Sequence, residues 1–138
     1  MGLTVVTANV NGIRAALRRG GLEWLAGCGA DVVCLQEVRA TPEQVGEALG
    51  AGGFGAWDLA LSDGARAGHA GVALLSRWPL TRVRTGPGDS EFDEQGRWVE
   101  GRVHPPAGPA VTVASVYVHT GEAEGPRHAE KDRFLVAM

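Results

Sequence analysis

Two apolar segments of the sequence are each followed by polar side chains that could bind a metal ion. Asn9 and Asn11 come directly after the β-branched segment 3–8, and Glu37 follows the apolar segment 31–36. If both segments are strands that end side by side, one carboxylate and two carboxamides meet at one edge of a sheet. A hard cation such as Mg²⁺ takes oxygen ligands from one or two carboxylates, from water and from substrate phosphate. The pattern therefore predicts part of a site for phosphodiester hydrolysis.

Each of these polar residues also has a plain structural interpretation. A carboxylate after so apolar a segment lies either at the mouth of the strand or in the interior without a partner, and the second arrangement is costly. Glu37 could equally be a surface charge that ends the strand. Asn9 and Asn11 alternate, so their side chains point to opposite sides unless the chain turns at Asn11 and Gly12. Turn formation by itself explains an Asn-Gly pair, so the residues alone favour the plain interpretation for Asn11.

The segments that carry these residues are predicted to form a β-α-β unit. Segment 3–8 is a short strand, and segment 31–36 is an apolar run without alternation, which is typical of a strand covered on both faces. Between them, apolar residues at helical spacing over 13–25 predict a helix, which Gly20 and Gly21 break into two pieces. The unit is expected to bring the ends of the two strands together.

The rest of the chain is predicted to contain a helix, then strands, then another helix. Thr41 as N-cap and Pro42 at the first helical position open the first of these helices, and the Gly-rich segment 50–55 ends it. The short connections between the strands predict antiparallel neighbours. A helix begins near Pro126 without any signal for its end, so the sequence predicts a single domain, residues 1–138, truncated inside that helix. The predicted strands are 56–61, 70–76, 81–85, 97–104 and 110–119.

Composition and charge restrict the class of protein. At 138 residues and 44% hydrophobic content, the chain has the size of one domain and can bury a core. Its net charge of -3 disfavours nucleic-acid binding through overall charge, so any such binding depends on local clusters of basic residues. The amino terminus lacks the pattern of a signal peptide, and no apolar run approaches membrane-spanning length. These features predict a cytoplasmic protein that does not bind a membrane.

Cysteine, histidine and tryptophan residues do not indicate a further site. Cys28 and Cys34 lack metal-binding spacing and are predicted to be small buried hydrophobes. The histidines share no metal-ligand spacing, so a zinc site is not expected. Tryptophans can stack on unpaired bases, but these lie in a helical stripe or within or beside strands, so core packing is predicted for all of them. They are Trp24, Trp57, Trp78 and Trp98.

Several blocks of sequence, in a fixed order, match the landmarks of one family of proteins. The blocks are 9–14, 34–37, 68–76, 93–97, 116–118 and 130–134. On these blocks the chain resembles the exonuclease III family of DNA-repair nucleases, which includes the apurinic/apyrimidinic endonucleases and belongs to the endonuclease/exonuclease/phosphatase superfamily. The resemblance implies an α/β (α+β) fold, namely the amino-terminal portion of a four-layer α/β/β/α sandwich with a mostly antiparallel mixed sheet. Family members are longer, and their second half supplies an Asp-x-Asn pair and an Asp-His pair that this chain lacks.

The resemblance implies roles for the residues near the two strand ends. Glu37 would bind Mg²⁺, or Mn²⁺ in its place, and Asn11 would lie beside the metal. Asn9 would form hydrogen bonds to the catalytic groups. Tyr117 would direct its hydroxyl at the scissile phosphate, whereas the residues alone predict core packing for an aromatic side chain within a strand. The pair His119-Thr120 departs from the Pro-Asn or Pro-Ser-like pair that is common in the family, which could move a loop near the substrate.

The resemblance also implies that four basic residues position DNA through its backbone. Arg14 and Arg39 follow the two strand ends, and His69 lies in a loop that would contact phosphates. Arg97 would lie near the substrate strand. Such contacts position DNA and do not read its bases. On the residues alone, Arg97 could instead form exposed ion pairs with the acidic residues of segment 89–94.

The activity implied by the resemblance is Mg²⁺-dependent hydrolysis of DNA phosphodiesters in base-excision repair, at abasic sites and from 3′ ends. The expected partner is double-stranded DNA with such lesions, and no obligate protein partner is expected. The isolated chain is expected to be inactive because the water-activating groups would come from the absent half. Two alternatives stay open: a non-catalytic fragment or DNA-binding half that needs a complementary chain, and a phosphoesterase of the same superfamily.

Overall fold

The chain forms helices and strands in nearly the order that the sequence predicts. The computed structural model describes residues 2–64, 68–120 and 125–138. The helices are α1 (Ile13–Arg18), α2 (Gly21–Gly27), α3 (Pro42–Ala51) and α4 (Pro126–Ala137). The strands are β1 (Val5–Asn9), β2 (Val32–Gln36), β3 (Asp58–Ser62), β4 (Val72–Ser76), β5 (Leu80–Arg84), β6 (Trp98–Val103) and β7 (Val111–Val116).

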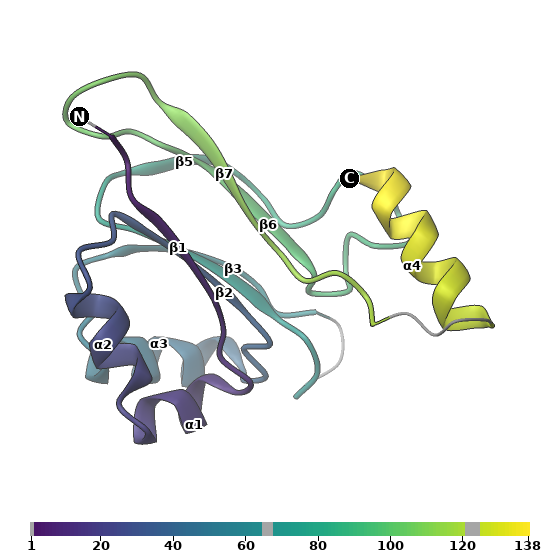
Figure 1. Cartoon of the computed structure of the whole chain (residues 1–138), viewed down its shortest axis with the longest axis horizontal. Coiled ribbons are helices and arrows are strands. Elements are labelled where there is room, and N and C mark those ends of the chain that lie inside the picture. The colour runs from purple at the N-terminus through teal and green to yellow at the C-terminus, as the bar shows by residue number, and fades with distance from the viewer. Residues whose placement is uncertain (1, 65–67, 121–124) are drawn as a thin grey trace.

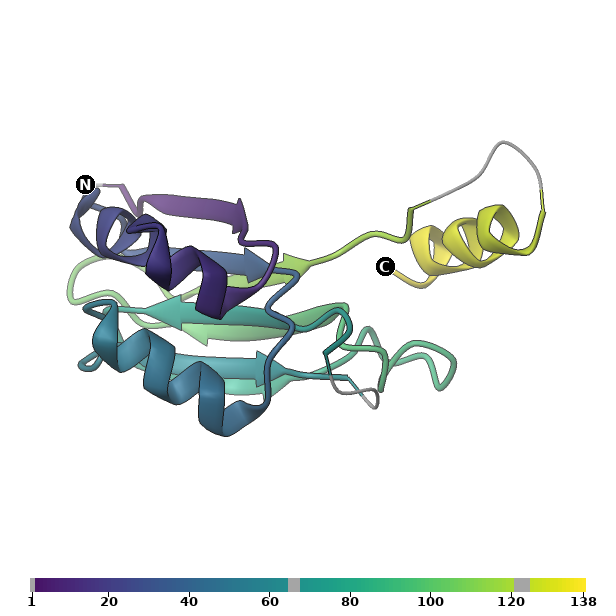
Figure 2. The same cartoon turned by 90° about the horizontal axis from the view of Figure 1, so that it is seen from below.

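These elements build three layers. Helices α1, α2 and α3 cover one face of the sheet that contains β1 to β4, and the sheet of β5, β6 and β7 covers the other face (Figure 1). Helix α4 lies to one side of these layers, beyond the end of the sheets (Figure 2). In the part of the chain that the structure describes, no helix has the length and apolar character needed to cross a bilayer.

The two sheets differ in how their strands pair. The first has the order β1-β2-β4-β3, in which β1 is parallel to β2 and the other neighbours are antiparallel. Asn9 lies opposite Gln36 in the parallel pair, so both strands end at the same edge of the sheet. The second sheet, β5-β6-β7, is antiparallel throughout. The predicted α/β class with mostly antiparallel mixed pairing is therefore confirmed.

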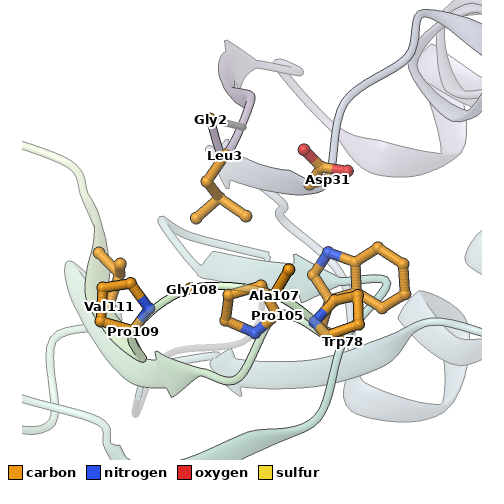
Figure 3. Close-up of a pocket in the computed structure, with 10 residues that line it drawn as sticks. Gly2, Leu3, Asp31, Trp78, Pro105, Ala107, Gly108, Pro109 and Val111 are labelled. Atoms are coloured by element: carbon orange, nitrogen blue, oxygen red, sulfur yellow. The ribbon is translucent and has the colours of Figure 1, made fainter.

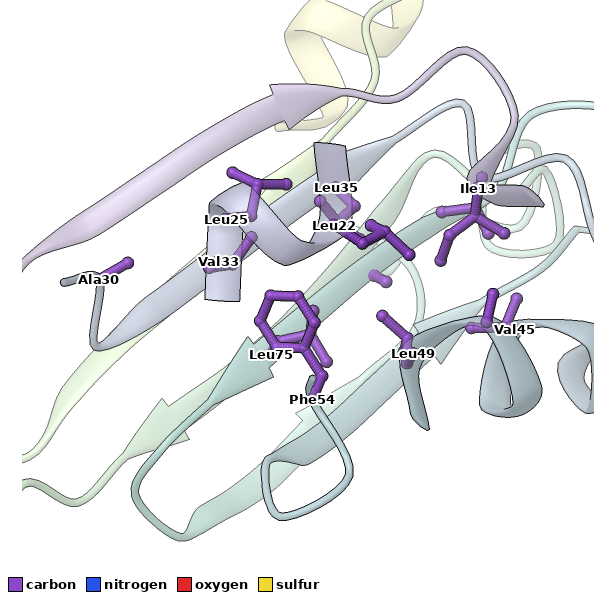
Figure 4. Close-up of a cluster of buried hydrophobic side chains, with 13 residues drawn as sticks. Ile13, Leu22, Leu25, Ala30, Val33, Leu35, Val45, Leu49, Phe54 and Leu75 are labelled. Atoms are coloured by element: carbon purple, nitrogen blue, oxygen red, sulfur yellow. The ribbon is translucent and has the colours of Figure 1, made fainter. Parts of the chain in front are cut away.

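Two apolar clusters hold the layers together. One lies between the helices and the first sheet and includes Leu22 and Leu35 (Figure 4). The other lies between the sheets and includes Val32, Leu74 and Val99. All five residues of β2 are buried because its alternating side chains enter both clusters. This explains the unbroken apolar run in the sequence, and each such side chain stabilises the fold by about 1.5–3 kcal/mol.

Helix boundaries follow the signals in the sequence. Thr41 is the N-cap of α3: its Oγ1 accepts a hydrogen bond from the backbone N–H of Gln44 (3.3 Å), and Gln44 Oε1 accepts one from the N–H of Thr41 (3.1 Å). This reciprocal pair satisfies two N–H groups at the start of the helix. Gly20, with a φ of 79°, separates α1 from α2, so the predicted break is confirmed.

Three expectations about the fold are wrong. Strands β4 and β5 are not neighbours, because the chain passes from the first sheet to the second between them. Trp24 is 68% exposed, since it lies two residues after the buried Leu22 and faces the other side of α2. Cys28 is exposed at the C-cap of α2, whereas Cys34 is buried in β2 as predicted. The half-buried tryptophans are Trp57, Trp78 and Trp98.

Replacing Leu22 by alanine should lower the free energy of unfolding by about 2–5 kcal/mol, because it leaves a cavity in the fully buried cluster between the helices and the first sheet. The control is Leu59→Ala on β3, where the side chain is 41% exposed and the loss should be much smaller. Urea unfolding followed by circular dichroism measures both changes. Equal losses at the two positions would show that the core does not lie where the structure places it.

Candidate functional site

The predicted proximity of the two strand ends is confirmed. The backbone pairing of β1 and β2 continues into the loops that follow them. The N–H of Gly12 donates to the C=O of Glu37 (2.8 Å), and the N–H of Ile13 donates to the C=O of Val38 (2.9 Å). The two loops are thereby held side by side, and the side chains of Asn9 and Glu37 meet.

The backbone at this edge adopts left-handed conformations that residues other than glycine rarely take. Asn11, Glu37 and Arg39 have φ values of 45°, 51° and 51°. Between the two charged residues, Val38 is fully buried, and its N–H donates to the C=O of Gly71 (3.0 Å). The buried valine anchors the loop while its charged neighbours lie at the edge of the sheet. Strained backbone of this kind is concentrated at functional sites.

Glu37 is the centre of a hydrogen-bonded network. Its Oε1 accepts a hydrogen bond from Asn9 Nδ2 (3.0 Å), and its Oε2 lies 2.6 Å from Arg39 Nη2. The hydroxyl of Tyr117 is a further neighbour that lowers the pKa of this carboxylate. The hydrogen bonds from Asn9 and Tyr117, aided by the charges of Arg39 and Arg97, hold the pKa of Glu37 below its usual range. The carboxylate is therefore ionised at neutral pH.

Asn9 uses both ends of its carboxamide. Its Nδ2 donates to Glu37, and its Oδ1 accepts a hydrogen bond from the backbone N–H of Asn11 (3.0 Å). The second bond forms an Asx turn, so the chain does turn at Asn11 and Gly12. Asn9 consequently orients the carboxylate of Glu37. Asn11 is exposed at the turn itself.

Tyr117 approaches the same carboxylate from the second sheet, just after β7. Burial and the hydrogen bond to Glu37 raise the pKa of Tyr117, so its hydroxyl keeps its proton at neutral pH. The guanidinium of Arg97 lies 5.0 Å from the centre of the tyrosine ring, and its Nη1 donates to the C=O of Tyr117 (3.4 Å). Tyr117 is half-buried and packs against the apolar cluster between the sheets, as its strand position predicts, while it also reaches the site.

Gln36 is not among the residues predicted from the sequence, yet it joins the two sheets directly behind Glu37. Its buried Nε2 donates to Thr7 Oγ1 (3.0 Å) and to Ser115 Oγ (3.1 Å). Ser115 Oγ in turn donates to the C=O of Leu35 (3.0 Å). The network links β1, β2 and β7. A glutamine at the end of a fully apolar strand is a signal that could have identified it, because a buried amide needs partners.

Arginine side chains line a hollow beside the turn after β2. The hollow has a volume of about 420 Å³ and is lined by Arg14 and Arg18 from α1, by Arg39 and by Gly68. His69 follows Gly68 directly and is exposed. Arg18 is absent from the predicted set, although its spacing of four residues from Arg14 places both on one face of the helix. The hollow offers the kind of cationic surface that attracts phosphates.

Arg97 lies at a different hollow, of about 260 Å³, near the start of β6. Its charge faces Tyr117, Glu130 and Glu37, so the pairing with the acidic segment 89–94 that the sequence left open is wrong. In that segment, Glu91 instead forms a two-oxygen ion pair with Arg133 of α4. The other residues that line the hollow are His119, Thr120, Arg127 and Glu130.

The donor set fits part of a metal site. Glu37 provides an ionised carboxylate at a strand end, and Mg²⁺ commonly binds proteins through one or two carboxylates with water and phosphate around it. Arg39 faces Oε2 of Glu37 with a side chain that is 46% exposed. Within the described residues, no group of three or more His, Cys, Asp or Glu side chains could hold a metal. The described residues therefore do not bring two further side chains of these types to Glu37.

A hollow at the opposite end of β1 and β2 has a different character (Figure 3). It measures about 320 Å³ and is lined mainly by apolar side chains such as Leu3, Trp78 and Pro105. Its acidic residue, Asp31, accepts a hydrogen bond from the N–H of Thr4 (2.9 Å). Because the length of β2 separates this hollow from Glu37, it is not part of the candidate site.

Sequence comparisons show which known proteins this chain is similar to. The profile of the Endonuclease/Exonuclease/phosphatase family matches residues 6–137. Recombination repair protein 1 of Drosophila melanogaster is 33% identical over 98 residues, which are 70% of this chain and 14% of that protein. DNA repair nuclease APEX1 of Danio rerio is 29% identical over 69% of this chain and 31% of its own length. The exodeoxyribonuclease of Bacillus subtilis is 31% identical over 69% of this chain and 36% of its own length.

Solved structures show the same fold. The 3′-5′ exonuclease NExo from Neisseria meningitidis aligns with a TM-score of 0.77 at 26% identity, over 99% of this chain and 49% of that one. The catalytic domain of Xenopus laevis APE2 aligns with a TM-score of 0.73 at 28% identity, over 96% and 51%. The fold is thus an α/β sandwich of the AP endonuclease type. The chain belongs to the Endonuclease/Exonuclease/phosphatase family, its resemblance to exonuclease III-like nucleases is confirmed, and it spans about half the length of these solved relatives.

Replacing Asn9 by alanine should raise the pKa of Glu37 towards its usual value, because the charged carboxylate loses its strongest stabilising hydrogen bond. Glu37 stabilises the fold above its unfolded pKa, and this contribution is lost as the pH falls through the lower folded pKa. Asn9→Ala should therefore reduce the acid-dependent loss of stability.

An NMR titration of the Glu37 carboxyl group measures this effect directly. The matched control is Gln44→Ala, which removes a carboxamide at the start of α3, away from Glu37. That variant should leave the titration of Glu37 unchanged. An identical Glu37 titration in Asn9→Ala and in the unmodified chain would contradict the network described above.

Proposed function

We propose that the intact protein is a cytoplasmic DNA-repair nuclease that hydrolyses phosphodiester bonds with the help of Mg²⁺. Its substrates would be double-stranded DNA with abasic sites or 3′-end lesions, cut as an abasic-site endonuclease or a 3′-5′ exonuclease during base-excision repair. The observation that carries this proposal is the ionised carboxylate of Glu37, held at a strand end by Asn9, Tyr117 and Arg39. The names of the relatives, which include a DNA repair nuclease and an exodeoxyribonuclease, support the same class of substrate.

Glu37 would hold the metal, with Asn11 beside it at the adjoining turn. A bound Mg²⁺ or Mn²⁺ would supply positive charge that polarises the phosphoryl group and stabilises the leaving oxygen. Asn9 keeps one carboxylate oxygen in a fixed position through its 3.0 Å hydrogen bond, so Glu37 does not have to be ordered when the metal binds. Arg39 would release the carboxylate and become available to the phosphate.

Tyr117 would stabilise the phosphate during the reaction. Its raised pKa keeps the hydroxyl protonated at neutral pH, so it can donate a hydrogen bond. A donor already in place at a phosphate oxygen stabilises the charge that develops in the transition state. Arg97, whose guanidinium lies 5.0 Å from the tyrosine ring, would add positive charge on the same side of the site.

The remaining basic residues would position the DNA backbone. Arg14, Arg18 and Arg39 line one hollow, and His69 adjoins it. Because the chain carries a net charge of -3, this local cluster rather than the overall charge would attract DNA. Phosphate contacts carry no direct sequence information, which suits a nuclease that must find a lesion in any sequence.

A group that could activate water is missing from the surroundings of Glu37 in the described residues. The groups that shift the pKa of its carboxylate are Asn9, Tyr117, Arg39 and Arg97, and none of them is a second carboxylate or a histidine. We therefore propose that the isolated chain has no appreciable nuclease activity. The same observation favours a second candidate function, that of a DNA-binding half which acts only with a complementary chain.

The isolated chain should bind a duplex with one abasic site at low salt without cleaving it in the presence of Mg²⁺. Fluorescence anisotropy measures binding, and gel electrophoresis of the labelled strand measures cleavage, with Bacillus subtilis exodeoxyribonuclease as the active control. Arg14→Ala should lower the slope of log affinity against log salt by about one, because one phosphate contact is lost. Cleavage abolished by a chelator would overturn the half-site proposal, and a lack of binding at low salt would contradict the DNA substrate.

Mn²⁺ should bind at Glu37 in the isolated chain. As a paramagnetic ion, it should broaden the NMR signals of Asn9, Asn11 and Glu37 before those of the rest of the chain, and Glu37→Gln should abolish the effect. The control is Asp31→Asn, at the opposite end of β2, which should change nothing at this edge. Broadening that is centred elsewhere, or that survives in Glu37→Gln, would contradict the proposed ligand.

A further inference from the structure

His119 is a buried histidine at the junction of three segments that lie far apart in the sequence. It is 7% exposed and follows Tyr117 by two residues. Its ring packs edge to face against Phe92, from the segment before β6, and against Phe134 of α4, with centroids 5.7 Å and 5.0 Å away. Phe92 and Phe134 also contact each other, at 5.2 Å. The aromatic cluster therefore joins the end of β7, the segment before β6 and helix α4.

The polar atoms of the His119 ring define its tautomer. Nε2 lies 2.7 Å from Glu130 Oε1 and 2.8 Å from Gln95 Oε1. An ionised carboxylate can only accept, and the amide of Gln95 is oriented because its Nε2 donates to the C=O of Glu91 (2.9 Å). The proton must therefore lie on Nε2. Nδ1 is buried without a hydrogen-bond partner among the described residues, so a second proton there would have no acceptor.

The Nε2–H group of His119 is a buried polar link between α4 and the turn that carries Arg97. A second polar link, between Arg133 and Glu91, is exposed on both sides, where solvent weakens ion pairs. Gln95 accepts from His119 and stands two residues before Arg97, whose backbone C=O in turn accepts from the N–H of Tyr117 (2.9 Å). The hydrogen bonds of one imidazole ring therefore connect α4 with the turn that carries Arg97.

We propose that His119 is a positioning residue: as the neutral Nε2–H tautomer it fastens α4 to the Gln95–Arg97 turn and so holds Arg97 against Tyr117. The attachment of α4 stands on the contacts themselves, and only its consequence for catalysis rests on the proposed function.

The charges around His119 predict that the attachment weakens in mild acid. Desolvation and the charge of Arg97 hold the pKa of His119 below its usual range, while Glu130 on α4 and Glu91 on the segment before β6 act in the opposite direction. Because the folded pKa is lower than the unfolded one, the neutral ring contributes its full stability above about pH 6.5. That stability is lost as the pH falls from there through the folded pKa.

Amide hydrogen exchange of the 138-residue chain tests the proposal. His119→Phe keeps the aromatic packing but removes the donor, and it should lower the protection factors of α4 roughly tenfold to a hundredfold, as expected for loss of a hydrogen bond to a charged group. His119→Gln, which offers an N–H group, should recover part of the protection. The control is His128→Phe on the same helix, where the exposed histidine faces Asp132 (3.3 Å) and protection should not change.

The pH dependence of amide exchange in α4 is a second measurement, and aromatic packing alone would not produce it. In the unmodified chain, protection factors of α4 should fall between pH 7 and pH 5 more steeply than those of β2, and His119→Phe should remove this difference. Unchanged α4 protection in His119→Phe, or a pH dependence that persists in it, would overturn the proposal. If that variant does not fold, Glu130→Leu removes the acceptor from the helix side and must give the same loss.

The ring itself can be examined without any substitution. NMR of the imidazole nitrogens should show a proton on Nε2 and none on Nδ1 at neutral pH, and the opposite tautomer would exclude the proposed link. None of these measurements uses DNA, metal or cleavage. If the proposed nuclease function is wrong, the results expected for His119 do not change. If the His119 link is wrong, the experiments on Glu37 still test its role.

Discussion

The register between β1 and β2 is the constraint on which the site depends. Asn9 lies opposite Gln36, so the residues that follow the two strands share one edge of the sheet. A slip of one residue would turn every side chain of β2 to the opposite face. The register is enforced from both sides, because every residue of β2 is buried either under the helices or against the second sheet. Gln36 adds a polar link to β1 and β7 next to Glu37.

The interaction between Tyr117 and Glu37 has two electrostatic consequences. It lowers the pKa of the Glu37 carboxyl group and raises that of the Tyr117 phenol. The same contact therefore keeps Glu37 charged and Tyr117 protonated over the neutral pH range. Two groups with pKa values moved apart can take different roles, one as a cation ligand and the other as a hydrogen-bond donor. These roles remain predictions, while the proximity that makes them compatible is a property of the structure.

Local patterns predicted the elements well because they depend on neighbouring residues. The N-cap at Thr41, the break at Gly20 and the doubly covered strand at 32–36 each follow from side-chain chemistry within a few positions. The same local reasoning failed for Trp24, whose exposure depends on which face of α2 meets the sheet. It also failed for the step from β4 to β5, since a short connection can join either neighbouring strands or two different sheets.

By itself, the sequence determined the β-α-β unit and, with it, the meeting of Asn9 and Glu37. Neighbouring parallel strands joined through a helix end at one edge, so the predicted unit favours this meeting, and the observed strand pairing confirms it. Only the tertiary structure decided that Tyr117 and Arg97 reach the same carboxylate and that Gln36 binds both sheets together. Those contacts depend on how the second sheet is laid across the first, and that packing is set by apolar side chains distributed over the whole chain rather than by any local motif.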